Sequence, residues 1–286
     1  MVKVLLDKLD GLFAAIAQKE TLYIPTDTPT GAKYEKWSDG MKMSDALNTV
    51  RSPKDFFFPQ TENLMEFKTE GKKIEIIDIR RENEDFVLFG VKGCDVASFD
   101  VLDKVFLAEP VDSFYKNRRE HATVVSLACN RPHETCFCGT FGIDASAPGG
   151  DVVCIKTDDA LFMDAKTEKG EKLLSVIAEF TESTDGKEAA DTAGVIRERL
   201  KKLPLSSLSA EAFGDGKTSK FFDAPEWKEL SQTCLGCGTC TFVCPTCQCY
   251  DIKDFNTGHG VKRFRCWDSC MYSDFTKMSA GQPRLT

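Results

Sequence analysis

Four cysteines near the carboxyl end of the sequence have a spacing that can bind metal. The run from Cys234 to Pro245 reads C-x2-C-x2-C-x3-C-P, with thiols at Cys234, Cys237, Cys240 and Cys244. Bacterial ferredoxins hold iron–sulfur clusters with this spacing, and the fourth cysteine ligates the other cluster when two are present. We therefore expect the first three thiols to ligate one cluster and Cys244 to reach toward another.

Zinc is the main alternative metal for this run, because zinc sites also use C-x2-C pairs. A zinc ion needs four ligands, which usually come from two pairs that are well apart in sequence. The third cysteine, Cys240, follows only three positions after Cys237 and is surplus to such a pair. The spacing therefore favours an iron–sulfur cluster over zinc.

A second group of cysteines follows directly, with Cys247, Cys249, Cys266 and Cys270 as local candidates for the remaining ligand positions. We expect Cys247, Cys249 and Cys270 to bind metal together with Cys244. Two arrangements stay open. Either two clusters use eight thiolates of this segment, or one cluster lies here and sequence beyond Thr286 supplies the other ligands. The last residues carry no helix stop, and we expect the natural polypeptide to continue.

A third group of cysteines lies earlier in the chain, at Cys94, Cys129, Cys136 and Cys138, in polar stretches that contain Gly and Pro. Loops that follow strands can converge at one end of an α/β sheet. We therefore expect a third cluster at these four thiols, with buried, inert cysteines as the alternative. Cys154 lies within an apparent strand and is expected to be such an inert core residue. We expect His133 to be an ordinary exposed loop residue.

Composition limits the classes of protein to which the chain can belong. The 286 residues are 42% hydrophobic and 29% charged, which is ordinary for a globular protein. The net charge of −8 argues against binding to nucleic acid or to anionic membrane surfaces. No stretch approaches the ~18 apolar residues of a membrane span. Thirteen cysteines without a secretory leader predict reduced metal ligands in a cytoplasmic protein kept from oxygen.

Short apolar runs alternate with helical patterns through about residue 180. This alternation predicts an α/β or α+β amino-terminal domain with a mixed sheet, followed by a small ferredoxin-like iron–sulfur domain. We expect a first helix over 4–17, a helix over 94–106, and two strands over 74–79 and 86–91 separated by a charged turn. Further strands are expected over 124–127, 152–155 and 161–163.

The proposed division of the chain places an α/β domain at 1–222 and the ferredoxin-like domain at 223–286. Residues 181–222 hold a helix near 192–202 and then a Ser-, Gly- and Asp-rich connector. A short helix is expected over 225–230. The apolar stretch 52–60 reads as a loop that fills the core, and Arg118 and Arg119 read as surface ion-pair residues.

Six segments in one order resemble a known family: Ser52–Gln60, Phe89–Asp95, Tyr115–Arg119, Cys136–Gly139, Cys244–Cys249 and Trp267–Cys270. The series resembles the 4Fe-4S dicluster electron-transfer subunits of the sulfhydrogenase beta and anaerobic sulfite reductase A family. The resemblance covers about residue 50 to the end. Family members usually continue into a second C-x2-C-x2-C-x3-C-P run, and this chain stops before it, so we expect the iron–sulfur domain to be truncated.

The resemblance implies an electron relay that carries two or three 4Fe-4S clusters. Its expected partners are a flavin-containing reductase subunit, which would hold the FAD or FMN, and a hydrogenase, sulfite reductase or heterodisulfide reductase type subunit. Two other functions remain open. One is an enzyme whose cluster near Cys244–Cys270 has an open iron that reduces substrate, and the other is a zinc-stabilised interaction module.

Overall fold

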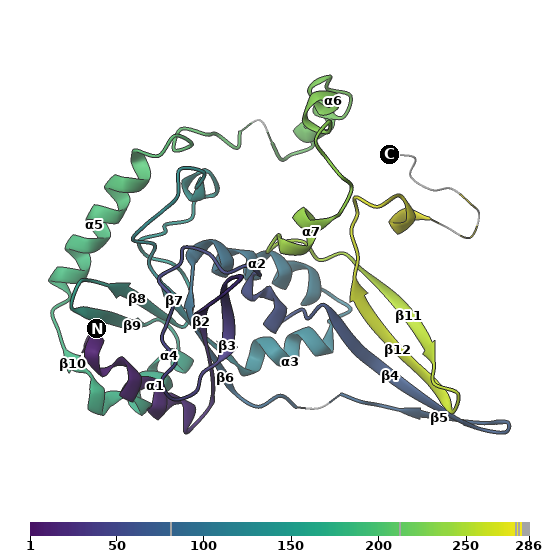
Figure 1. The fold of residues 1–286 in the computed structure, drawn as a ribbon, viewed down its shortest axis with the longest axis horizontal. Helices are drawn as coiled ribbons and strands as arrows, with labels where there is room; N and C mark the ends of the chain where they lie inside the picture. Colours follow the sequence, from purple (N-terminus) through teal and green to yellow (C-terminus); the bar gives the residue numbers. More distant parts are fainter. Residues whose placement is uncertain (81, 212, 278, 280, 282–286) are drawn as a thin grey trace.

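The structure is a computed structural model that describes residues 1–80, 82–211, 213–277, 279 and 281. Two β-sheets organise it (Figure 1). The larger sheet contains β1 (Val2–Leu5), β2 (Thr21–Thr28), β3 (Gly31–Lys36), β6 (Phe86–Val91), β7 (Ala122–Leu127), β8 (Val152–Lys156), β9 (Ala160–Ala165) and β10 (Glu182–Ser183). The smaller sheet contains β4 (Thr61–Glu70), β5 (Lys73–Ile77), β11 (Tyr250–Asn256) and β12 (Gly260–Trp267).

Helices flank the larger sheet and continue into the carboxyl-terminal segment. The α-helices are α1 (Leu9–Ala17), α2 (Gly93–Phe106), α3 (Ser113–His121), α4 (Glu168–Val176), α5 (Lys187–Lys201), α6 (Glu226–Leu230) and α7 (Thr239–Val243). The 3-10 helices are η1 (Leu6–Lys8), η2 (Pro53–Phe56), η3 (Cys138–Phe141), η4 (Ala178–Phe180), η5 (Lys217–Phe221) and η6 (Ser273–Thr276).

The larger sheet is mixed, as the sequence predicts. Its strand order is β10-β1-β9-β8-β7-β6-β2-β3. The central strands β2, β6, β7 and β8 run parallel to one another, and the outer strands pair antiparallel. The carboxyl ends of the parallel strands therefore meet at one edge, where ligand sites of α/β sheets usually form.

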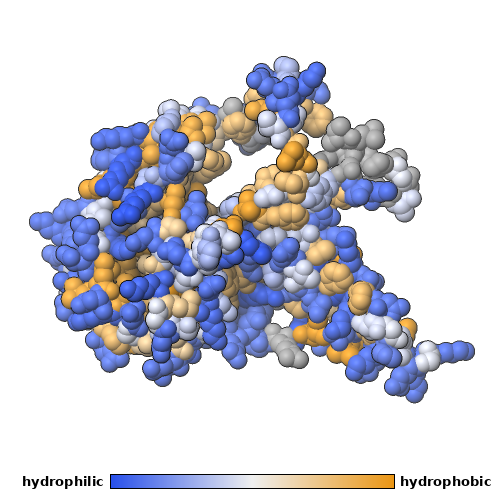
Figure 2. Space-filling model, in the orientation of Figure 1, coloured by the Kyte–Doolittle hydropathy of each residue, from blue (hydrophilic) through white to orange (hydrophobic). Residues whose placement is uncertain are grey.

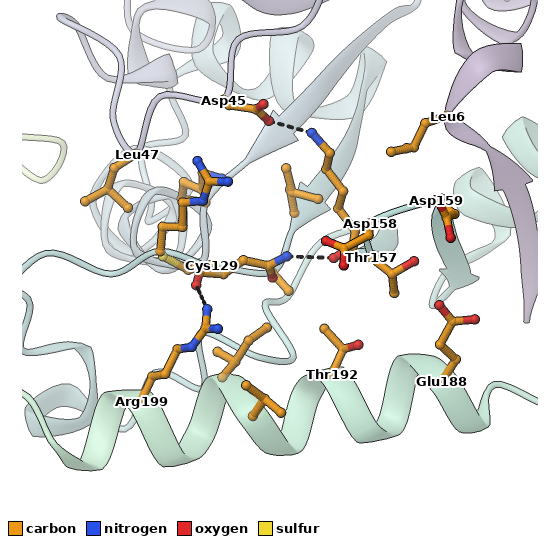
Figure 3. Close-up of a pocket in the computed structure, with 18 of the residues that line it drawn as sticks. Leu6, Asp45, Leu47, Cys129, Thr157, Asp158, Asp159, Glu188, Thr192 and Arg199 are labelled. Atoms are coloured by element: carbon orange, nitrogen blue, oxygen red, sulfur yellow. Dashed lines mark hydrogen bonds and ion pairs between the residues drawn. The ribbon is translucent and has the colours of Figure 1, made fainter.

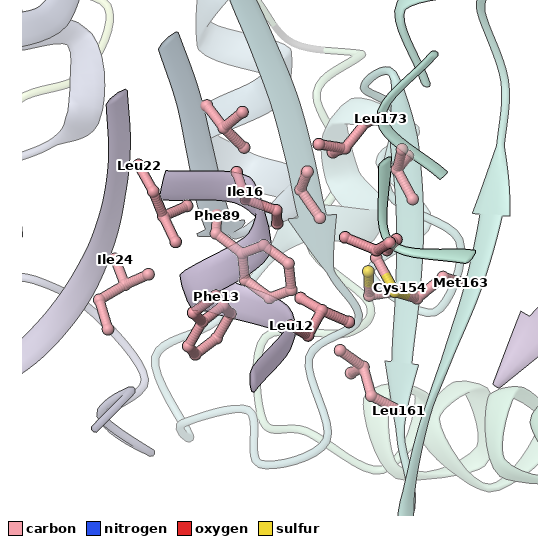
Figure 4. Close-up of a cluster of buried hydrophobic side chains, with 14 of the residues drawn as sticks. Leu12, Phe13, Ile16, Leu22, Ile24, Phe89, Cys154, Leu161, Met163 and Leu173 are labelled. Atoms are coloured by element: carbon pink, nitrogen blue, oxygen red, sulfur yellow. The ribbon is translucent and has the colours of Figure 1, made fainter. Parts of the chain in front are cut away.

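One face of this sheet is covered by α1 and α4 (Figure 4). Leu12, Phe13 and Ile16 of α1 are almost fully buried against it. The Phe13 ring meets the Phe89 ring edge-on at 5.1 Å between centroids, a favoured aromatic geometry. Cys154 lies in the same apolar layer and burial raises the pKa of its thiol, which confirms the expected inert core cysteine.

The opposite face carries α2, α3, α5 and the residues just after η2. Phe57 and Phe58 are completely buried there, which confirms that the stretch 52–60 fills the core. Phe57 packs against Phe99 of α2 with 4.8 Å between ring centroids. The sheet therefore has helices on both faces, and burial of these side chains is the main force holding the layers together.

The smaller sheet joins segments that are far apart in the sequence. Its order is β11-β12-β4-β5, and β12 pairs antiparallel with β4. This sheet crosses the boundary proposed at residue 222, because β4 and β5 precede that residue and β11 and β12 follow it. In Figure 1 it extends away from the larger sheet, while the chain after α5 runs around the other side to α6.

Most elements expected from the pattern are present, with two corrections. The predicted helix over 94–106 is α2, and the strands expected over 124–127, 152–155 and 161–163 are β7, β8 and β9. The strands expected over 74–79 and 86–91 are β5 and β6, but they lie in different sheets rather than on either side of a turn, because β5 pairs with β4 and β6 with β7. The first helix is also shorter than expected, since the chain begins with β1 and η1.

Figure 2 shows that polar residues cover most of the visible face, while apolar residues gather around α7 and the loop before it. Leu235 in that loop is 92% exposed, and Val243 of α7 is also exposed. Exposed apolar residues therefore flank the cysteine run.

Candidate metal centre

The first thiol group combines Cys94, Cys129, Cys136 and Cys138. Cys94 lies in the first turn of α2, directly after β6, and Cys129 follows β7. Cys136 and Cys138 lie in the connection from β7 to β8, where Cys138 begins η3. Because β6, β7 and β8 are parallel, these loops share the carboxyl edge of the sheet.

The thiols of this first group are close enough to affect one another electrostatically. Burial, together with the charges of Asp95, Cys138 and Cys129, raises the pKa of Cys94 to about 12. Burial also raises the pKa of Cys138, with added contributions from Cys136 and Cys129. The structure therefore brings together the four cysteines that the sequence separates by up to 44 positions, from 94 to 138.

Lys92 supplies positive charge to the first thiol group. Burial lowers the pKa of Lys92. The charges of the neighbouring Cys129 and Cys94 oppose this shift but do not cancel it. A cation beside thiols favours their thiolate form, which is the form that ligates metal. A backbone amide also points at sulfur here, since the N–H of His133 donates to Cys136 Sγ at 3.3 Å. His133 itself is exposed, as expected.

The ferredoxin-type run forms an open loop before and within α7. Cys234, Cys237 and Cys240 are all exposed. Gly236 and Gly238 have φ values of 66° and 69°, a left-handed conformation that glycine adopts without steric cost. At Gly238 an added Cβ would also collide with the Tyr272 hydroxyl. The loop needs glycine at this position for both reasons.

Hydrogen bonds to sulfur already occur in this loop. The Gly236 amide donates to Cys234 Sγ at 3.4 Å. Hydrogen bonds from the Thr239 hydroxyl and amide lower the pKa of Cys237. The Tyr272 hydroxyl donates to the Cys237 carbonyl at 2.8 Å and ties the loop to the segment after β12. Such donors to sulfur are one of the means by which proteins tune cluster potentials.

The second thiol group combines Cys244, Cys247, Cys249 and Cys270. Burial and the adjacent Cys244 raise the pKa of Cys247 to about 12. Burial acts to raise the pKa of Cys244, but hydrogen bonds from Thr246 and Cys247 outweigh it and lower that pKa. Cys244 is therefore the first of these two thiols to ionise.

Cys249 and Cys270 complete this second group. Burial raises the pKa of Cys249, and the charge of Cys270 adds to the shift. The charge of Cys249 also raises the pKa of Cys247. This interaction links the pair Cys249 and Cys270 to the pair Cys244 and Cys247. The Asp268 amide donates to the Cys249 carbonyl at 3.0 Å and fixes the loop that carries Cys270. Cys266 lies instead within β12, where it pairs with Asp251 and Thr61.

Lys54 and two aromatic side chains line the second thiol group. Lys54 Nζ donates to the Cys244 carbonyl at 2.6 Å and to the Cys247 carbonyl at 3.1 Å. It also lies 4.2 Å from the centre of the Trp267 ring. Trp267 stacks on Phe242 of α7 with a ring-centre distance of 6.4 Å. These residues place apolar surface beside the thiols, where it limits the access of water.

A buried ion network attaches the cysteine-bearing segment to the first domain. Arg265 of β12 is 2% exposed and contacts Glu62 of β4 at 2.6 Å. Arg265 also pairs with Asp112, the N-cap of α3, and Glu62 also pairs with Arg118. The expected ion-pair role of Arg118 and Arg119 is confirmed, although both pairs are more buried than a surface role implies.

The donor set fits iron–sulfur clusters. Both groups consist of thiols, with amide donors aimed at sulfur and cations nearby, and Fe–S clusters are held by thiolates. Within the ranges described by the structure, no three His, Cys, Asp or Glu side chains form a site for a single metal ion. Each iron of a cube takes its own thiolate, so the ligand sulfurs lie farther apart than around one zinc ion.

A cleft of about 660 Å³ opens beside the first thiol group (Figure 3). Its walls come from the ends of β6 and β7, the β8–β9 turn and α5. Lys156 and Asp45 pair across it at 2.5 Å, and Arg199 donates to the Asn130 carbonyl at 2.6 Å. Cys129 lies in the wall, so the cleft gives access to the first thiol group.

Three residues near the thiols were missed by reasoning from the sequence: Lys92, Lys54 and Arg265. The available signal for Lys54 is a charged residue close to large apolar side chains, since Pro53 precedes it and three phenylalanines follow Asp55. Arg265 likewise stands between Phe264 and Cys266 in a strand. The signal shows that the charge needs a partner, but not which one.

Comparisons with known proteins agree with this donor set. A family model described as a 4Fe-4S dicluster domain matches residues 233–286. The sulfhydrogenase 2 subunit beta of Pyrococcus furiosus is 31% identical over 227 residues, which are 79% of this chain and 66% of that protein. No solved structure matches the chain. Among the residues described, no helix has the length and apolar character needed to cross a bilayer.

Proposed function

Because this chain belongs to the 4Fe-4S dicluster electron-transfer subunit family, we propose that it relays electrons through iron–sulfur clusters within a multisubunit oxidoreductase complex. The observation that carries the proposal is the gathering of eight cysteines into two thiol groups, one in each part of the chain. A cluster takes up and releases one electron at a time when bound. The protein contributes thiolates, amide donors and a partly dry surrounding, and needs no substrate pocket at the cluster.

The proposed ligands follow from the grouping of the thiols. Cys94, Cys129, Cys136 and Cys138 would hold one cluster at the carboxyl edge of the larger sheet. Cys244, Cys247, Cys249 and Cys270 would hold a second beside Trp267. The exposed run with Cys234, Cys237 and Cys240 would ligate a further cluster.

The proposed partners are a reductase subunit that carries FAD or FMN and a terminal subunit of the hydrogenase, sulfite reductase or heterodisulfide reductase type. The name of the Pyrococcus relative, a subunit of a sulfhydrogenase, supports the first of these terminal types. The exposed apolar residues around the cysteine run suit contact with another subunit. We place this complex in the cytoplasm, where cysteines remain reduced.

Anaerobic purification of the chain from its native host tests the proposal. Iron, acid-labile sulfide, zinc and flavin are measured in the same preparation, and the co-purifying subunits are identified. We expect iron and sulfide in equal amounts, with flavin only on a partner. A colourless protein that contains zinc and no iron would refute the electron-transfer function.

A pair of substitutions tests the first cluster separately. Replacing Cys94 and Cys138 together by Ser removes two of four proposed ligands, and should lower the iron content by about four per chain. The matched control is Cys154→Ala, a core cysteine that belongs to neither group, and its iron content should equal that of the wild type. Unchanged iron in the double variant would make the first group structural.

A further inference from the structure

Lys54 places a buried cation directly beside the second thiol group. The residue is 1% exposed, although lysine is among the residues that are almost never fully buried without a partner. Its ammonium donates to the backbone carbonyls of Cys244 and Cys247 at 2.6 and 3.1 Å. Carbonyl oxygens satisfy the hydrogen bonds of an ammonium group but do not neutralise its charge.

The first domain fixes the position of Lys54. Its backbone lies in η2, whose N-cap is Ser52. The Ser52 hydroxyl accepts from the Lys54 amide at 3.3 Å and donates to Asp95 of α2 at 2.9 Å. The following Phe57 and Phe58 are completely buried. The backbone of Lys54 therefore belongs to the rigid core, while its ammonium reaches across to the cysteine-bearing segment.

The surroundings leave the charge of Lys54 without a carboxylate partner. Among the described residues, no carboxylate lies within ion-pair distance of Lys54 Nζ. The adjacent Asp55 pairs instead with Arg51 at 2.7 Å. On its other side Lys54 faces the Trp267 ring at 4.2 Å. The charge of the neighbouring Asp55 also acts on Lys54, but less strongly than the thiolates of Cys247 and Cys244 do.

We propose that Lys54 is a positioning residue that raises the reduction potential of the cluster bound by the second thiol group. This inference rests on the iron–sulfur function proposed above. Reduction adds one electron and makes the cluster more negative, so a nearby cation stabilises the reduced form more than the oxidised form. Because Lys54 is buried, water screens its charge poorly. Its two hydrogen bonds also hold the backbone between the two ligands.

The test measures reduction potentials rather than activity. The full chain is loaded with iron and sulfide under argon, and each cluster is titrated potentiometrically with detection by electron paramagnetic resonance. The signal of the second cluster is identified by its loss in Cys247→Ser. Lys54→Gln keeps an N–H donor but removes the charge, and we expect it to lower the potential of that cluster alone. Lys54→Arg keeps the charge and should leave the potential close to that of the wild type.

Lys169 provides a matched control. Its ammonium also donates to two backbone carbonyls, those of Arg119 at 3.2 Å and Ala122 at 2.9 Å, on a side of the fold without cysteine ligands. Lys169→Gln should leave every potential unchanged. Lys54→Met, which suits the apolar surroundings, is a second charge-free variant if Lys54→Gln does not load iron.

The outcomes separate this inference from the proposed function. A wild-type chain that binds no iron would refute the function itself. A wild type that binds iron, with an unchanged potential in the charge-free Lys54 variant that loads it, would overturn the role of Lys54. Equal shifts in Lys54→Arg and Lys54→Gln would also overturn it, because the charge would then not be the cause.

Discussion

The ion network around Arg265 allows a quantitative prediction for Arg265→Met. The substitution keeps an unbranched side chain against Phe58 and Phe106, whose rings lie 5.2 and 5.6 Å from the guanidinium. It removes the charge that faces Glu62 and Asp112. Since the guanidinium is 2% exposed and the Glu62 side chain 4%, solvent cannot replace the lost partner.

The magnitude follows from the cost of leaving a charge buried without its partner. Breaking a buried pair by removing one member costs about 3–5 kcal/mol. Glu62 keeps Arg118 as a second partner, and the Asp112 side chain is 19% exposed, so both carboxylates retain some stabilisation. We therefore expect the free energy of unfolding to fall by about 3 kcal/mol, the lower end of that range.

The assay is urea unfolding of the reduced chain under argon, followed by far-ultraviolet circular dichroism. Arg263→Met is the matched control, two positions earlier in β12. Arg263 pairs with Asp254 at 2.8 Å on the exposed part of the sheet, where ion pairs contribute little. We expect a much smaller loss there. Equal losses in the two variants would refute the argument that burial makes the Arg265 network important.

Two further predictions concern the cysteine run and the pH dependence of stability. Gly238→Ala should lower iron binding more than Gly236→Ala does. Both positions have a positive φ, but only at Gly238 would an added Cβ collide with the Tyr272 hydroxyl. Equal iron contents in the two variants would contradict this prediction. Hydrogen bonds to Asp85 and Glu82 raise the pKa of His121. The contribution of His121 to stability is therefore present below the ordinary pKa of histidine, and it is lost as pH rises through the raised pKa. Urea unfolding of the wild type and His121→Gln from about pH 5.5 to about pH 8.5 should therefore show a stability difference that shrinks toward high pH, and a constant difference would be the contrary result.

Local sequence determined the parts of this protein that depend on near neighbours. The spacing from Cys234 to Cys244 indicates cluster ligands, because a short loop can present several thiolates to one cube. Helix α2 and strands β7, β8 and β9 were also predictable, since apolar spacing within one element reports its type. The same pattern does not identify strand partners, so it does not show that β5 and β6 lie in different sheets.

Tertiary structure alone decided how the thiols are surrounded. Lys54 reaches a cysteine carbonyl 190 positions away, and Arg265 meets a carboxylate 203 positions away. The sequence shows that each charge stands next to large apolar residues, and burial of a charge is unfavourable unless a partner is present. It cannot name the partner, because that depends on how β4 and β12 pair and on where η2 packs. The sequence thus predicted the thiols, and the fold placed a buried cation beside one group of them.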